Sequence, residues 1–135
     1  MRVRQESEAD RQLLDSFEDL SLEKLEHTDH IRLVWLYLNR YESLKAGKIL
    51  ARGLKAYAES KGAFDKFHAT ITHALVLLMG RRYTENKLNE WPKFLAMNQD
   101  IVDDWHAILT EYYSRDLLFS DRARVSIVAP DLKSL

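Results

Sequence analysis

His27-Thr-Asp-His-Ile-Arg-Leu-Val-Trp-Leu-Tyr-Leu38 is the stretch of sequence around which we expect the fold to be organised. Its apolar side chains recur at spacings of three and four residues, which is typical of one face of an α-helix. This face consists of Ile31, Val34, Trp35 and Leu38, and it is widened by Leu33, Leu36 and Tyr37. Because the apolar face is wide, we predict a central helix over residues 28–40 that is buried on more than one side. Thr28 is the expected N-cap, since its hydroxyl can accept a hydrogen bond from an early backbone N–H.

The rest of the chain also favours helices, because it contains only four glycines and two prolines and lacks a long alternating apolar and polar segment. Helical spacing predicts further helices over residues 6–19, 42–61, 64–83, 91–98, 101–113 and 120–127. We expect a break near Asn98, and Ser120 as the N-cap of the last helix. Gly62 is the expected stop after the helix over 42–61, and Gly47 and Gly53 within it would let a neighbour approach closely.

We therefore predict an all-α fold, a single-domain bundle of five to seven helices over residues 1–135. The helices near 28–40 and 64–83 should be central, and residues 1–5 and 129–135 should form extended tails.

Composition and charge restrict the class of protein. The chain has 135 residues, of which 46% are hydrophobic and 30% charged, as expected of one soluble globular domain. The net charge of −1 provides no field that would recruit nucleic acid or an anionic membrane, so neither partner is expected. The absence of cysteine excludes disulfides, thiolate metal sites and a cysteine nucleophile. The charged start of the chain has no apolar core of a signal peptide, and we expect a cytoplasmic protein.

Three histidines are the candidate metal ligands. His27 and His30 share one side of the predicted central helix, and His68 lies on the apolar stripe of the helix predicted over 64–83. Two neutral imidazoles one helical turn apart, with a third from another helix, can hold a divalent transition metal such as zinc, iron or nickel and leave a position open for water. The alternative is that each histidine is a core residue with its own hydrogen-bond partner.

Arg32, Thr72 and Arg124 are the candidate residues for binding an anionic substrate group. For both arginines a structural reading is also open. A buried arginine needs a partner, so Arg32 would either extend its charged end to water or pair with a carboxylate. Arg124 would pair with an acid such as Asp131.

Several short motifs resemble an uncharacterised family of small all-helical bacterial proteins. They are Glu26-His-Thr-Asp-His-Ile-Arg-Leu33, Phe67-His-Ala-Thr-Ile-Thr72, Tyr112-Tyr-Ser114, Leu118-Phe-Ser-Asp-Arg-Ala-Arg124 and Val128-Ala-Pro-Asp-Leu132. The likeness covers residues 17–132. It implies a pocket around His27, His30 and His68, but no particular reaction. The family often has Glu after the second-motif histidine, where this chain has Ala69, so a catalytic carboxylate of its relatives would be missing here.

Two functions follow from these observations. One is a divalent-metal-dependent enzyme or a small-molecule binding protein with a histidine-lined pocket. The other is a structural or interaction module, a homodimer with core histidines and no catalysis, in which Trp35, Trp91 and Trp105 would serve the interface. The chain has no phosphate loop, no Gly-x-Ser-x-Gly elbow and no His-Glu-x-x-His, so no reaction is predicted.

Overall fold

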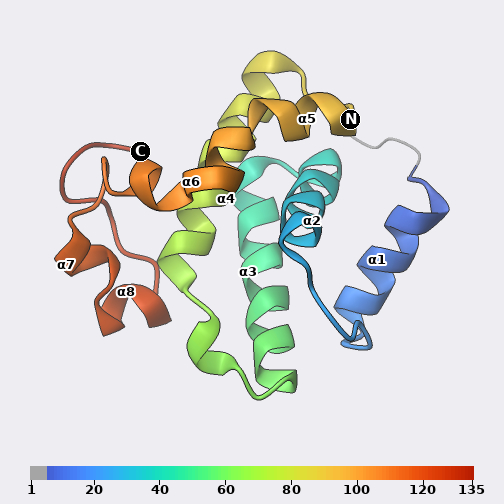
Figure 1. The fold of residues 1–135 in the computed structure, drawn as a ribbon, viewed down its shortest axis with the longest axis horizontal. Coiled ribbons are helices and arrows are strands. Elements are labelled where there is room, and N and C mark those ends of the chain that lie inside the picture. The colour runs from blue at the N-terminus through green and yellow to red at the C-terminus, as the bar shows by residue number, and fades with distance from the viewer. Residues whose placement is uncertain (1–5) are drawn as a thin grey trace.

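The computed structural model describes residues 6–135, and this part of the chain is helical, without strands (Figure 1). The predicted all-α bundle is therefore confirmed, whereas the tail predicted at residues 1–5 lies outside the described residues. The elements are α1 (Glu8–Glu18), α2 (His27–Arg40), α3 (Ser43–Ser60), the 3₁₀ turn η1 (Phe64–Lys66), α4 (Ala69–Asn86), α5 (Trp91–Met97), α6 (Gln99–Leu109), α7 (Arg115–Leu118) and α8 (Asp121–Val125). Across residues 6–135, no helix combines the length and the apolar character that crossing a bilayer requires.

Helix α2 is buried on more than one side over its C-terminal half, as the sequence predicts. Its residues 33–39 are all buried, and the indole N–H of Trp35 donates to the backbone oxygen of Leu88 at 3.0 Å. The helix begins one residue earlier than expected, because Glu26 and not Thr28 is the N-cap. The side chains of Glu26 and Asp29 form a reciprocal capping box with each other's backbone N–H groups.

Helix α4 begins at Ala69, so the prediction of a helix from residue 64 is wrong. The spacing of Phe64 and Phe67 mimics a helical stripe, but η1 ends at Lys66 and Phe67 has an extended backbone. His68 is the N-cap of α4, and its Nδ1 accepts the backbone N–H of Ile71 at 3.1 Å. A side chain that satisfies an orphan N–H at this position starts a new helix.

Helix α1 and the residue Glu6 before it are held on α2 by polar side chains, and α1 also packs on α3 through an apolar contact. The pairs are Arg40 with Glu6, Arg32 with Asp10, and Tyr37 with Glu18, at 2.8, 2.7 and 2.7 Å. The apolar contact includes Gly53 of α3, where an added Cβ would lie 2.7 Å from the ring of Phe17. The close approach predicted at Gly53 is therefore confirmed.

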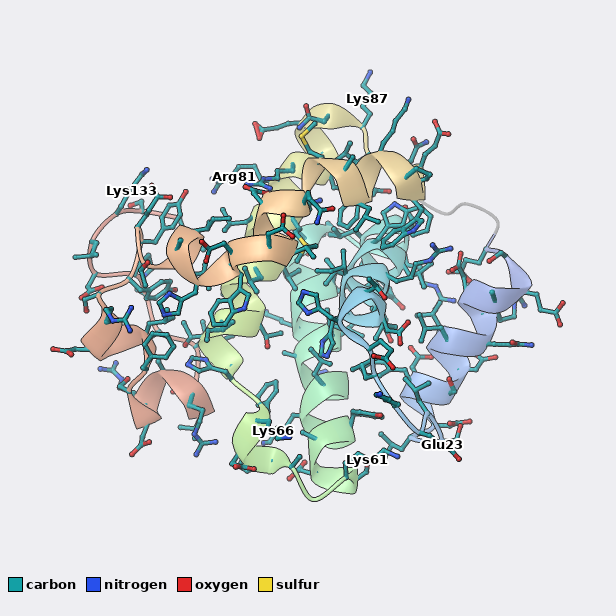
Figure 2. All side chains as sticks on the ribbon, viewed as in Figure 1. Glu23, Lys61, Lys66, Arg81, Lys87 and Lys133 are labelled. Atoms are coloured by element: carbon teal, nitrogen blue, oxygen red, sulfur yellow. The ribbon has the colours of Figure 1, made fainter. Side chains whose placement is uncertain are left out.

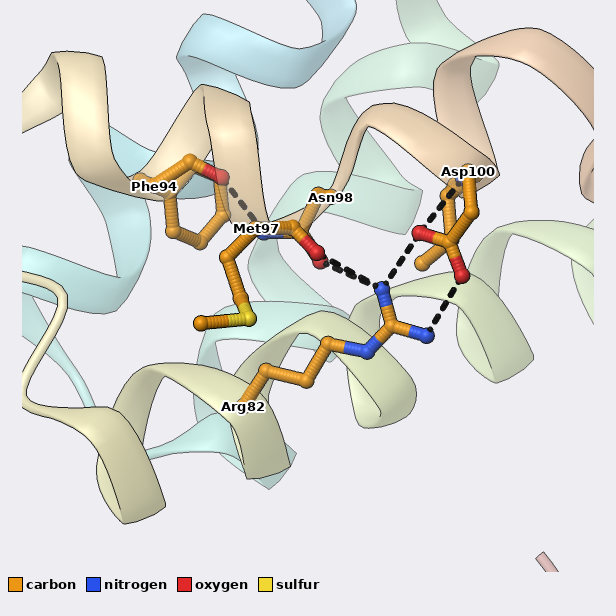
Figure 3. A network of polar contacts seen from close by, with 6 residues as sticks. Arg82, Phe94, Met97, Asn98 and Asp100 are labelled. Atoms are coloured by element: carbon orange, nitrogen blue, oxygen red, sulfur yellow. Dashed lines mark hydrogen bonds and ion pairs between the residues drawn. The ribbon is translucent and has the colours of Figure 1, made fainter.

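Helices α5 and α6 lie across one end of the bundle and are fixed by an arginine of α4 (Figure 3). Arg82 binds both carboxylate oxygens of Asp100, at 2.7 and 2.9 Å, and also donates to the backbone oxygen of Met97 at 3.1 Å. Asn98, which is fully buried, separates the two helices at the predicted break and donates to the backbone oxygen of Phe94. The sequence alone did not predict this clamp.

The C-terminal residues differ from the prediction in two ways. The helix predicted over 120–127 is shorter, Asp121–Val125, although Ser120 caps it as expected, and the four-residue helix α7 precedes it. Residues 129–135 are non-helical, and they are docked: the N–H of Leu132 donates to the backbone oxygen of Tyr112 at 2.9 Å.

Gly80 of α4 lies where α3 begins, and this contact gives a first prediction. A Cβ at Gly80 would lie 2.8 Å from the Cβ of Ser43, whereas a Cβ at Gly47 would meet Val76 at 3.5 Å, an ordinary contact. Gly80→Ala should therefore lower the free energy of unfolding by about 1–3 kcal/mol. The matched control Gly47→Ala should leave it unchanged or raise it by up to about 1 kcal/mol through helix propensity. Urea unfolding of both variants measures this, and equal effects would contradict the packing described for Gly80.

Candidate functional site

A cavity of about 680 Å³ lies between α2, α3, η1, α4, α6 and α8. Such a volume is typical of small-molecule sites in proteins. Its walls are mainly apolar, and they include Val34, Leu50, Leu54, Ile71, Met79 and Ile101. These residues come from four different helices, so the cavity is a product of the tertiary fold.

The structure brings most of the predicted site residues to this cavity. His27, His30, His68, Thr72 and Arg124 all line it. Arg32 does not line it. Five of the six candidate residues therefore share one cavity, and the contacts of each side chain determine what it can do there.

His68 already uses both ring nitrogens. Its Nδ1 accepts the N–H of Ile71, so this nitrogen carries no proton, and the Nε2–H donates to the backbone oxygen of Leu118 at 2.7 Å. Burial lowers the pKa of His68, and the positive charge of Arg124 lowers it further. The ring is therefore a neutral connector between the start of α4 and the end of α7.

His27 and His30 lie at the rim of the cavity, with exposed surface. The Nε2 of His27 is 3.2 Å from the backbone oxygen of Val102. The pKa of His30 is lowered, mainly because the concave protein wall around the ring removes water, and next because His27 is near. A ring can have exposed surface and still be poorly solvated when protein surrounds it on several sides.

The geometry does not add support to a metal site. In the part of the chain from residue 6 to 135, no three His, Asp or Glu side chains form a group that could hold a metal ion. The lone pair of His68 that a metal would need is occupied by the N–H of Ile71. The metal ion and its ligands His27, His30 and His68 stay a prediction from the sequence.

Thr72 and Arg124 offer different chemistry to a ligand. The hydroxyl of Thr72 donates to the backbone oxygen of His68 at 2.8 Å, which leaves its oxygen only as an acceptor. Arg124 has a buried Nη1 without a hydrogen-bond partner among residues 6–135. Asp131 instead accepts the backbone N–H of Ser114 at 2.7 Å, so the pairing of Arg124 with Asp131 is not observed.

Thr70 fixes the position of the helix that carries Arg124. The chemical reasoning from sequence did not single out Thr70. Its hydroxyl donates to the backbone oxygen of Ser126 at 2.9 Å and accepts the N–H of Val128 at 3.2 Å. Both partners follow directly after α8, so the fully buried Thr70 holds α8 against α4. A threonine near the start of an apolar helix was a weak signal for this role.

Arg32 belongs to a separate place in the fold. Its guanidinium pairs with the buried carboxylate of Asp10 and lies over the ring of Trp91, with its carbon 4.5 Å from the ring centroid. These residues line a second cavity of about 570 Å³ beside α1 and α5. Of the two structural alternatives for Arg32, the structure shows the pairing with a carboxylate, and it separates Arg32 from the other candidate anion-binding residues.

Comparisons of the chain with protein-family models, with curated proteins and with solved structures found no match. The resemblance to a bacterial family therefore stays a prediction, and the function has to be argued from the cavity itself.

The lowered pKa values of His30, His68 and His73 predict how stability depends on pH. As the pH falls, the histidines of the unfolded chain, with an ordinary pKa of about 6.5, take up protons at a higher pH than those of the folded chain. The free energy of unfolding should therefore be fully retained above about pH 6.5 and fall as the pH drops below it.

Urea unfolding at pH 7.5 and 5.5 measures this loss. His68→Ala should cost about 1–3 kcal/mol at the higher pH, because the N–H of Ile71 and the oxygen of Leu118 lose a partner. The difference between His68→Ala and the wild type should shrink at the lower pH. A wild type that is equally stable at both values would contradict the lowered pKa of these histidines.

Proposed function

We propose that this protein binds a small, largely apolar molecule in the cavity between α2, α3, η1, α4, α6 and α8. The observation that carries the proposal is a mainly apolar cavity of about 680 Å³ into which a few polar side chains project. Apolar walls supply binding free energy in proportion to the ligand surface they cover, and a few polar groups orient the ligand.

The polar groups of the cavity could also take part in a reaction of the bound molecule. Imidazoles held neutral at pH 7, as the lowered pKa of His30 favours, can accept a proton from a bound molecule. The metal-dependent enzyme predicted from sequence is a narrower form of the proposal. Elemental mass spectrometry of the tag-free protein, with His27→Ala as a control, tests it directly.

The alternative, a homodimeric interaction module, has less support. Trp35 is buried within the core of a single chain, Trp91 packs under Arg32, and Trp105 lines the cavity. The tryptophans that a dimer interface was expected to use are therefore engaged within one chain. Sedimentation at several protein concentrations distinguishes the two possibilities.

A neutral fluorescent reporter tests the proposal. N-phenyl-1-naphthylamine should bind at one saturable site, and Leu54→Trp should weaken this binding about tenfold or more, because Leu54 lines the cavity and the larger ring would fill part of it. The matched control is Leu44→Trp in the same helix, where the side chain is 49% exposed and does not line the cavity.

Circular dichroism during heating verifies that both variants remain folded. The proposal would be contradicted by a wild type that shows no saturable binding, or by equal binding to Leu54→Trp and the wild type.

A further inference from the structure

One end of the cavity combines a cation with apolar walls, and this combination selects a class of ligand. Resting on the proposed function, we infer that the ligand is a single-chain aliphatic carboxylate. Its carboxylate binds the guanidinium of Arg124, and its hydrocarbon chain lies along the apolar walls of the cavity.

The first support is the unsatisfied donor of Arg124. Its Nη1 is buried and has no hydrogen-bond partner in the described part of the chain, and no acid of residues 6–135 forms an ion pair with it. A buried N–H donor without a partner is costly, and more so when it belongs to a charged group. A carboxylate compensates a guanidinium well, because its two oxygens match the planar fork of N–H donors.

The second support is the position of Arg124 at a positively charged end of the cavity. Its guanidinium carbon is 5.7 Å from the ring centroid of Phe64, which places it beside η1. Lys61 and Lys66 line the cavity at the same turn, and Figure 2 shows both at the end where α3 leads into η1. Among the described residues that line the cavity, Asp65 is the sole carboxylate. The charge at this end favours an anion over a neutral or cationic group.

The third support is the character of the remaining wall. Away from η1 the cavity is lined mainly by apolar side chains, among them Val34, Leu50, Val76, Met79 and Ile101. Methionine and leucine side chains adapt to a flexible hydrocarbon chain, and burial of each methylene is worth about 0.8 kcal/mol. An amphiphile with one anionic end therefore matches both the charged and the apolar parts of the cavity.

The attachment of α8 to α4 means that the binding site is formed before a ligand binds. Ala123, the neighbour of Arg124, is fully buried, and Thr70 holds the residues that follow the helix. The guanidinium is thus presented from a fixed backbone, which limits the entropy lost when a ligand binds.

Three probes with the same hydrocarbon chain test the inference: decanoate, decanol and decyltrimethylammonium, each titrated calorimetrically below its micelle concentration. The wild type should bind decanoate about tenfold or more tightly than decanol, since a charged hydrogen bond contributes this much, and should bind the cation most weakly. Arg124→Gln should remove the preference for decanoate and leave decanol binding unchanged. The matched control Arg122→Gln, which alters an exposed arginine of the same helix, should retain the preference.

The outcomes separate the ligand class from the proposed function. Equal binding of decanoate and decanol by the wild type, or a preference that survives in Arg124→Gln, contradicts the assignment of a carboxylate ligand. The proposed apolar binding site is then unaffected. Failure of all three probes and of the neutral reporter overturns the proposed function and the inference together. If Arg124→Gln does not fold, the comparison of the three probes on the wild type still decides, and Arg124→Lys should retain part of the preference.

Discussion

The side chain of Thr70 joins two segments that are far apart in the sequence, and the rest of the site depends on this contact. Its hydroxyl serves both the backbone oxygen of Ser126 and the backbone N–H of Val128. Val128 is buried, so its N–H needs a partner within the protein. Two residues earlier, His68 makes the matching contact to Leu118. The start of α4 therefore holds the C-terminal segment at two points.

This attachment adds a further wall to the cavity of the helical bundle. Without α8, the cavity between α2, α3 and α4 would lose one of its walls and the guanidinium of Arg124. Leu118 and Ala123 are fully buried, which shows that the short helices α7 and α8 are part of the core. A segment of four- and five-residue helices has little helical stability of its own, so its order comes from these tertiary contacts.

The sequence predicts the features that depend on local patterns. The apolar face of residues 31–38 identifies α2, Asn98 separates α5 from α6, and Ser120 caps α8. Prediction from the sequence fails where one side chain ends a helix pattern that the apolar spacing would continue. Phe64 and Phe67 continue the helical spacing of α4, yet His68 ends that spacing by acting as an N-cap.

Contacts between residues far apart in the sequence were the part of the site that the sequence could predict least. The sequence singled out His27, His30, His68, Arg32, Thr72 and Arg124 as candidate site residues. All but Arg32 line one cavity, and the partners of each depend on the tertiary fold. No spacing rule connects Thr70 to Val128 or Arg82 to Asp100. The same limit explains why the absence of a partner for Arg124, which suggests a ligand, became visible only in three dimensions.

Hydrogen exchange in Thr70→Val tests most directly whether this side chain holds the wall that carries Arg124. The valine keeps the shape and removes both hydrogen bonds, so amides over residues 115–128 should exchange faster than in the wild type, while those of α2 should not change. Thr72→Val is the matched control, because its hydroxyl bonds only within its own helix start. Unchanged exchange over residues 115–128 in Thr70→Val, or the same acceleration in Thr72→Val, would contradict this account.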